Sequence, residues 1–153
     1  DSKRFPVPTK KFDVDQQVWA KNKNSSWLVK VSGDEMETIS KIESASDRLG
    51  DLCTINQGVR TGDNEKYLSD KKSGDLWKPA AGGKHVGRYN PLKKGIFVYY
   101  DPKVLDAPRK PELFSSSEKL VVQEIRNITL PRRIIATYDH EQVYCLQSTN
   151  VIN

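Results

Sequence analysis

Two glycine-containing segments hold the residues of this chain that are best suited to chemistry. The first segment, residues 57–68, reads QGVRTGDNEKYL and places Arg60 and Thr61 between Gly58 and Gly62. Because glycine accepts positive φ angles, the backbone can turn sharply here and expose its N–H groups, with Arg60 and Thr61 at the apex. The pattern is compatible with a phosphate cradle, a catalytic loop, or a turn between two strands.

The second segment, residues 76–95, reads LWKPAAGGKHVGRYNPLKKG and is rich in hydrogen-bond donors. Four of its side chains suit anion or base contact: Lys84, His85, Arg88 and Tyr89. Lysine and arginine neutralise phosphates, arginine also forks onto guanine, and histidine or tyrosine reaches base edges. Residues 78–94 include five basic residues, one histidine and no acid. This run indicates a local anion-binding face that suits a polynucleotide, and the alternative is a solvated basic loop.

Several enzyme signatures are absent from the sequence. A P-loop requires Ser or Thr after its Gly-Lys pair, and His85 follows Gly83 and Lys84 instead. The Asn-Pro-Pro-Tyr motif of amino-methyltransferases is also missing, since Leu92 replaces the second proline in YNPLKK. Neither histidine has the local setting of a catalytic triad, and His140 in YDHEQVY is expected in a hairpin turn. The chain alone is therefore expected to be non-catalytic.

One enzymatic alternative stays open. Metal-dependent nucleases hold Mg²⁺ with carboxylates on neighbouring strands and use a nearby lysine to activate water. Asp101 in YYDPK and Glu124 in VVQEIRN resemble this arrangement loosely. The expected lysine position is occupied by Arg126, which does not give up a proton near neutral pH. The alternative to a nuclease is two carboxylates in strand-end turns.

Composition places the chain among folded, single-domain proteins. Its 153 residues carry a net charge of +5 and are expected to form one domain over residues 1–153. No apolar run is long enough to span a bilayer and no signal peptide is evident, so we expect a cytoplasmic protein. Cys53 and Cys145 lie far apart without nearby ligand spacing, which favours reduced thiols and no metal site.

Hydrophobic periodicity predicts a strand-dominated α+β fold. Met36, Ile39 and Ile42 recur at helical spacing and predict one N-terminal amphipathic helix over residues 33–46, with its apolar stripe in the core. Short Val-, Ile- and Tyr-rich runs between turn residues predict strands in mixed, twisted sheets. Extended segments are expected within residues 12–20, 26–31, 49–59, 65–70, 95–101, 119–125, 131–139 and 142–148, with one helical turn within residues 106–120.

A family resemblance rests on three stretches that occur in this order: KIESASDRLGDLCTINQGVRTGDNEKYL, then LWKPAAGGKHVGRY followed by GIFVYYD, and then EKLVVQEIRN. In residues 16–152 the chain resembles the TaqI-like specificity domain, the target recognition domain of restriction-modification enzymes and adenine-specific DNA methyltransferases. The resemblance implies a module that reads double-stranded DNA while a separate catalytic domain does the chemistry. It further implies a fragment of a larger parent whose upstream methyltransferase domain uses S-adenosylmethionine, with Mg²⁺ for cleavage, and no cofactor in the fragment itself.

Position by position, the resemblance matches Gly58, Thr61, Gly62 and Asn64 in the first segment and Lys78, Pro79, Gly83, Lys84, Arg88 and Tyr89 in the second. Residues at and around these positions are expected to take two roles. The residues expected to contact DNA are Arg60, Thr61, Asn64, Lys84, His85, Arg88, Tyr89 and Arg126. The residues expected to shape the turns are Gly58, Gly62, Pro79 and Gly83, with Asn64 also bracing the first turn. The family commonly has Asp where this chain has His85, so the role of His85 is open. Arg132 and Arg133 are candidates to extend the face, and a basic module that docks an acidic protein is the remaining alternative.

Overall fold

The computed structural model describes residues 11, 13–20, 31–93, 95–124, 129, 131 and 133–153, and all structural statements refer to these. The chain divides into two compact units, residues 1–48 and residues 49–153, each of which is described by itself. The expectation of one domain over residues 1–153 stays a prediction.

The first unit contains helices α1 (Gln16–Ala20) and α2 (Gly33–Ser44). The predicted amphipathic helix is confirmed as α2, which begins with a capping box: Ser32 Oγ accepts from the N–H of Glu35, whose carboxylate accepts from the N–H of Ser32. Met36 is buried, but Ile42 is 59% exposed, so the prediction that the whole apolar stripe is core is wrong at Ile42.

The sequence predicts an extended segment at residues 12–20, and this prediction is wrong for α1. Asp15 lies directly before the helix, and its carboxylate accepts a hydrogen bond from the N–H of Gln17 at 2.9 Å. An acidic cap of this kind satisfies one of the free N–H groups at a helix start. The extended segment expected at 26–31 lies, except for Val31, outside the described residues.

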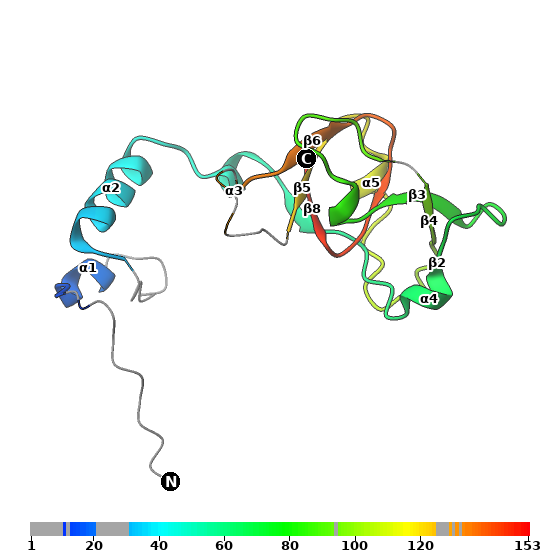
Figure 1. The fold of residues 1–153 in the computed structure, drawn as a ribbon, viewed down its shortest axis with the longest axis horizontal. Coiled ribbons are helices and arrows are strands. Elements are labelled where there is room, and N and C mark those ends of the chain that lie inside the picture. Colours follow the sequence, from blue (N-terminus) through cyan, green and yellow to red (C-terminus); the bar gives the residue numbers. More distant parts are fainter. Residues whose placement is uncertain are drawn as a thin grey trace, which may run out of the picture. The chain divides into compact units, whose positions relative to one another are not determined.

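The second unit contains two four-stranded sheets (Figure 1). The first has the order β1 (Ile55–Gln57), β8 (Thr149–Ile152), β5 (Lys119–Gln123), β6 (Ala136–Asp139), with all neighbours antiparallel. The second has the order β2 (Leu68–Ser69), β4 (Ile96–Tyr99), β3 (Trp77–Ala81), β7 (Tyr144–Cys145), with β3 and β7 parallel. The α+β, strand-dominated fold class is thereby confirmed.

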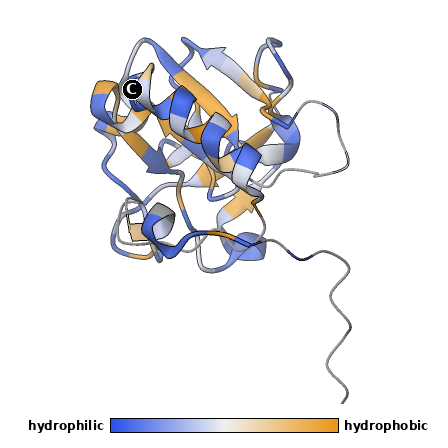
Figure 2. Cartoon of the chain, turned by 90° about the vertical axis from the view of Figure 1, so that its left-hand side faces the viewer, coloured by the Kyte–Doolittle hydropathy of each residue, from blue (hydrophilic) through white to orange (hydrophobic). Residues whose placement is uncertain are grey.

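Short helical turns precede or connect these strands. They are α3 (Leu49–Leu52), α4 (Asn64–Tyr67), the 3-10 turn η2 (Gly83–His85) and α5 (Glu112–Ser115). The helical turn expected within residues 106–120 is α5. Its Phe114 is fully buried and packs with Tyr100 and Tyr144, with ring centroids 6.4 and 4.7 Å from that of Phe114. Figure 2 shows hydrophobic residues concentrated along the strands, as expected for a sheet-based core.

A tight corner joins the two sheets. β7 ends at Cys145 in the second sheet, and β8 begins at Thr149 in the first, so only residues 146–148 separate them. Leu146 donates its N–H to the carbonyl of Ala81 at 2.9 Å, and Thr149 donates to the carbonyl of Leu146 at 2.9 Å. This corner, residues 145–149, fixes the ends of both sheets at one place.

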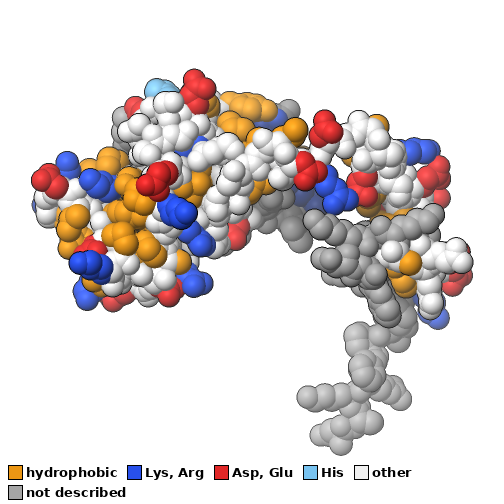
Figure 3. Space-filling view, turned by 180° about the vertical axis from the view of Figure 1, so that it is seen from behind, with side chains coloured by type: hydrophobic (Ala, Val, Ile, Leu, Met, Phe, Trp, Pro, Cys, Tyr) orange, Lys and Arg blue, Asp and Glu red, His pale blue; other side chains and the backbone are white. Residues whose placement is uncertain are grey.

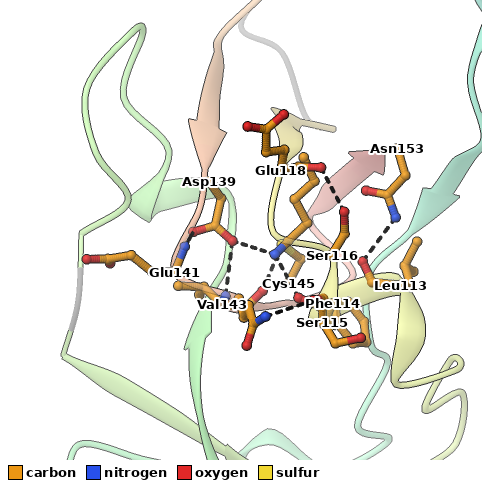
Figure 4. A network of polar contacts seen from close by, with 12 residues as sticks. Leu113, Phe114, Ser115, Ser116, Glu118, Asp139, Glu141, Val143, Cys145 and Asn153 are labelled. Carbon is orange, nitrogen blue, oxygen red and sulfur yellow. Dashed lines mark hydrogen bonds and ion pairs between the residues drawn. The ribbon is translucent and has the colours of Figure 1, made fainter.

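A fully buried ion pair lies between β5 and β6. Lys119 and Asp139 are cross-strand partners whose side chains are 0% and 2% exposed, with Lys119 Nζ 2.5 Å from Asp139 Oδ2. Lys119 also donates to the carbonyl of Phe114, and the Asp139 carboxylate accepts from the N–H groups of Val143 and Glu141 (Figure 4). These added hydrogen bonds satisfy groups that would otherwise be costly to bury.

Candidate functional site

The first glycine segment packs tightly against the corner of residues 145–149. Gly58 donates its N–H to the carbonyl of Thr149 at 3.0 Å, and Val59 donates to the carbonyl of Cys145 at 2.7 Å. A Cβ atom on Gly58 would lie only 2.3 Å from the carbonyl oxygen of Cys145. Gly58 is thus required for close backbone approach, whereas positive φ is found at Gly62, where φ is 81°.

Arg60 faces a neighbouring loop. Its main chain pairs with Ala107 through two hydrogen bonds of 2.9 Å, and its side-chain Nε forms an ion pair with Asp106. Both side chains are about half exposed. A phosphate that contacts Arg60 would therefore compete with the Asp106 carboxylate for the guanidinium group.

Thr61 and Asn64, both expected to contact DNA, differ in exposure and are hydrogen-bonded to each other. Thr61 is 4% exposed, and its hydroxyl donates to Asn64 Oδ1 at 2.6 Å, so it is too deep to contact DNA directly. Asn64 is exposed at the start of α4, which Asp63 caps by accepting from the N–H of Lys66. Because the amide oxygen of Asn64 is held by Thr61, its Nδ2 donor group is the one left for a ligand.

The second glycine segment includes β3, and the turn after that strand is held against the same corner. Gly83 donates its N–H to Ser148 Oγ at 2.8 Å and accepts from the side-chain amide of Gln123 at 3.1 Å. A Cβ on Gly83 would lie 2.9 Å from the carbonyl oxygen of Ser148, so glycine is required for this close approach. Lys84, the next residue, is exposed.

His85 is fixed in one orientation by the backbone. Its Nδ1 accepts a hydrogen bond from the N–H of Gly82 at 2.9 Å, so the neutral ring carries its proton on Nε2. Burial, followed by the positive charge of Lys84, lowers the pKa of His85 below its ordinary value of 6.5. At neutral pH His85 therefore offers a fixed Nε2–H donor rather than a cationic side chain.

The two glycine segments meet at one cavity of about 590 Å³, which we call the site cavity. Its lining comes from both segments and from the corner between them, and comprises Asn64, Leu68, Ser69, Asp70, Gly82, Gly83, Lys84, His85, Ile96, Gln123, Leu146 and Ser148. Two predicted contact regions that are twenty residues apart in sequence, at Asn64 and Lys84, thus share one surface. Arg60 and Thr61 are not among the lining residues.

Arg88 and Tyr89 extend the second segment away from the site cavity. The Arg88 guanidinium lies over the Tyr89 ring at 4.9 Å from its centroid, and its Nη1 is buried without a hydrogen-bond partner in the described residues. Tyr89 is 81% exposed in the left-handed region at φ 57°, and its N–H donates to the carbonyl of Ala136. Tyr89 lines a second cavity, beside β6.

Pro79 lies within β3 at a position where a proline is tolerated. Its register partner on β4 is Phe97, while β7 pairs with β3 only from Ala80 onward. The missing N–H therefore costs no hydrogen bond to β7. Of the remaining basic candidates, Arg126 and Arg132 lie outside the described residues, and Arg133 is exposed.

The two carboxylates of the nuclease alternative have separate local roles. Asp101 caps the turn after β4 by accepting from the N–H of Lys103 at 2.9 Å. Both oxygens of Glu124 accept from the Gln57 side-chain amide, at 2.9 and 2.8 Å. In the described part of the chain, no group of three or more His, Cys, Asp or Glu residues could hold a metal ion.

Several polar residues that line the site cavity were not predicted as site residues from the sequence. Ser148 and Gln123 hold Gly83 in place, and Asp70 adds a carboxylate to a cavity that otherwise carries Lys84. Ser148 and Gln123 lie in runs that were predicted as strands, where a polar residue ordinarily faces solvent. No spacing rule connects them to the glycines, because the connection depends on how the two sheets meet.

Comparison with known proteins adds no family to these observations: no family model and no curated protein matches the sequence. Among the described residues, no helix has the length and apolar character required to cross a membrane.

Proposed function

We propose that this chain is a DNA target recognition module that binds duplex DNA through its two glycine segments. The observation that carries the proposal is the site cavity, where Asn64 from the first segment and Lys84 and His85 from the second lie on one surface. All three are residues that the sequence predicts to contact DNA. The proposal also rests on the resemblance to the TaqI-like specificity domain.

The side chains at the site cavity, together with Arg88 outside it, divide into two kinds of contact. Lys84 and Arg88 supply charge for phosphates, which position a duplex without reading its sequence. Asn64 Nδ2 and the Nε2–H of His85 are oriented donors, which suit the acceptor atoms N7 and O6 of guanine in the major groove. Asp70 offers an acceptor, which suits the amino group of cytosine.

The distribution of charge over the rest of the molecule indicates that DNA is attracted by one basic segment rather than by the net charge of the whole chain. On the face in Figure 3, the Lys and Arg side chains of residues 49–153 are interspersed with Asp and Glu. Phosphate contact therefore depends on the acid-free run at residues 78–94 more than on the net charge of +5.

The proposal is tested by measuring binding to a randomised duplex library at low salt. Lys84→Ala is expected to weaken binding to all sequences alike and to lower the salt slope by about one. Asn64→Ala is expected to relax the preference at one base pair, at a cost of about 1–3 kcal/mol on the preferred sequence.

Lys103→Ala is the matched control for Lys84→Ala. Lys103 is exposed and follows β4, at the end of the sheet where Trp77 pairs with Tyr99, whereas the site cavity lies at the opposite end of β3. Its replacement should leave affinity and salt slope unchanged. Unchanged binding of both Lys84→Ala and Arg88→Ala on every sequence would contradict the proposed surface, and Mg²⁺-dependent cleavage lost in Asp101→Ala would favour the nuclease instead.

The proposal separates DNA recognition by this module from catalysis by another domain of the parent protein. The module would position a separate methyltransferase domain of the same longer chain, with S-adenosylmethionine and Mg²⁺ bound there, in the cytoplasm. A methyltransferase motif encoded upstream of Asp1 would support this arrangement.

A further inference from the structure

The outer edge of β6 carries main-chain groups that are not used within the sheet. β6 is the last strand of its sheet, and among the described strands β5 is its one neighbour. The N–H of Gln123 donates to the carbonyl of Ile135 at 2.9 Å, so these two residues form a hydrogen-bonded pair of the antiparallel ladder between β5 and β6. Hydrogen-bonded and non-hydrogen-bonded pairs alternate along antiparallel strands. The main-chain N–H and C=O of Thr137 and Asp139 therefore point toward β5, whereas those of Ala136 and Tyr138 point outward.

Only half of this edge is covered. The carbonyl of Ala136 accepts the N–H of Tyr89 at 3.0 Å, and the Thr137 hydroxyl donates to the carbonyl of Asn90. No hydrogen bond of the main-chain N–H or C=O of Tyr138 is present in the described part of the chain. An edge of this kind is a template for an added strand.

An apolar groove lies beside β6 and includes Tyr138 of the uncovered half. It is the second cavity, of about 690 Å³, and its walls include Tyr89, Leu92, Leu120, Tyr138 and His140. Leu120 and Tyr138 are register partners with 45% and 47% of their surfaces exposed, and the Tyr138 ring stacks on that of His140 at 5.8 Å. Exposed apolar side chains that sit together beside a strand edge are typical of a binding surface.

The charged residues that line the groove are the acidic Asp139 and Glu141, and the Arg88 guanidinium lies over the Tyr89 ring at one wall. Glu118 lies near the Tyr138 hydroxyl. Asp139 is neutralised by Lys119. Negative charge at the groove disfavours binding of a nucleic acid strand and of a second copy of the same acidic edge. It favours a ligand with basic residues.

We propose that the edge of β6 binds an extended peptide segment of a partner protein, with apolar side chains in the groove and basic residues at its flanks. The peptide adds a strand to the sheet, with main-chain hydrogen bonds to the N–H and C=O of Tyr138. Apolar side chains at alternate positions contact Leu120, Leu92 and Tyr89. This inference does not depend on DNA binding.

The probe is the peptide acetyl-Lys-Val-Leu-Val-Lys-amide, titrated into the whole chain and followed by amide NMR. Saturable shifts are expected at Tyr138 and His140. The key comparison is between two variants, Tyr138→Pro and Tyr138→Ala, which both lose the ring but differ in the outward N–H. Proline is tolerated at this edge position because its missing N–H is not part of the ladder with β5. The proline variant should bind about tenfold more weakly than the alanine variant.

Changes to the probe test the same contacts without altering the protein. A peptide N-methylated at Leu and both Val residues should lose binding, and acetyl-Glu-Val-Leu-Val-Glu-amide should bind more weakly than the lysine peptide. Equal affinity of the two Tyr138 variants, or of the N-methylated and plain peptides, would overturn the proposal. So would shifts of the same amides by a thymidine oligonucleotide alone, or concentration-dependent shifts without peptide that reveal self-association.

Discussion

Lys119 and Asp139 face each other across β5 and β6 as a buried ion pair in which every oxygen and the ammonium group have further partners. The lysine is the second residue of EKLVVQEIRN, one of the stretches that resemble the specificity domain. Its contacts give that position a structural role: it joins α5, through the carbonyl of Phe114, to the end of β6.

Loss of one partner from this pair should be strongly destabilising. Lys119→Met leaves the Asp139 carboxylate buried without its counter-ion, so the free energy of unfolding should fall by about 3–5 kcal/mol. Urea denaturation followed by tryptophan fluorescence measures this change. Lys103→Met, at an exposed lysine, should alter stability by less than about 0.5 kcal/mol. Similar stability of the two variants would show that the pair contributes little.

Gly58 should not accept a side chain. In Gly58→Ala the new Cβ would meet the carbonyl oxygens of Cys145 and Leu146 at 2.3 and 2.4 Å, so the corner has to shift. A loss of about 1–3 kcal/mol is expected from overpacking. Gly50→Ala is the control, because no atom lies within 4 Å of the position its methyl group would take and alanine favours helix α3 by roughly 0.5–1 kcal/mol. Thermal denaturation of both variants should therefore give shifts of opposite sign.

Thr61 should influence base preference without touching DNA. Thr61→Val keeps the buried shape but removes the hydroxyl that holds Asn64 Oδ1. If Asn64 reads a base, its preference should weaken by about 1 kcal/mol, the value of one hydrogen bond, while the salt slope stays that of the unchanged chain. Binding to the duplex library at several salt concentrations separates the two quantities. A lower salt slope with intact preference would contradict this role.

The sequence predicted the elements with strong local signals. Helix α2 has both a period of apolar residues and a capping box, and its prediction needed no tertiary information. β4, β5 and β6 lie within Val-, Ile- and Tyr-rich runs and were predicted as strands. The expected strand at residues 65–70 instead begins as α4, because the Asp63 cap starts a helical turn before β2.

The site could be predicted only in part, because its geometry depends on long-range packing. Glycines and basic residues indicated the two segments, but no strand was predicted at β3 or at β8. β8 begins at Thr149, the last residue of the corner that brings the two glycine segments together. Burial of Thr61 likewise follows from packing, since a Thr in a glycine-rich turn is ordinarily at the surface.

His85 should make stability pH-dependent in the mildly acidic range. Its folded-state pKa lies below 6.5, chiefly through burial and then through Lys84, so the unfolded chain binds the proton more tightly. The stability from neutral His85 is fully present above the unfolded-state pKa of 6.5 and is lost as the pH falls through the folded-state pKa.

His85→Gln tests this pH dependence. The glutamine amide oxygen can accept from the N–H of Gly82 but does not titrate, so the variant should lose less stability than the unchanged chain between about pH 7 and 5. Urea midpoints measured over that range give the comparison. Parallel pH profiles of the two proteins would show that His85 is not the group responsible.

The two cysteines should differ in reactivity. Cys145 is fully buried, and burial raises its pKa to about 12, whereas Cys53 is only half-buried. Because the thiolate is the reactive form, at about pH 8 only roughly 10⁻⁴ of Cys145 is available even if the reagent reaches it. Intact-mass measurement after iodoacetamide treatment should show one modification on the native chain, at Cys53, and two in concentrated urea. Rapid modification of Cys145 in the native chain would show that the corner of residues 145–149 opens, and would count against the rigid link between the two glycine segments.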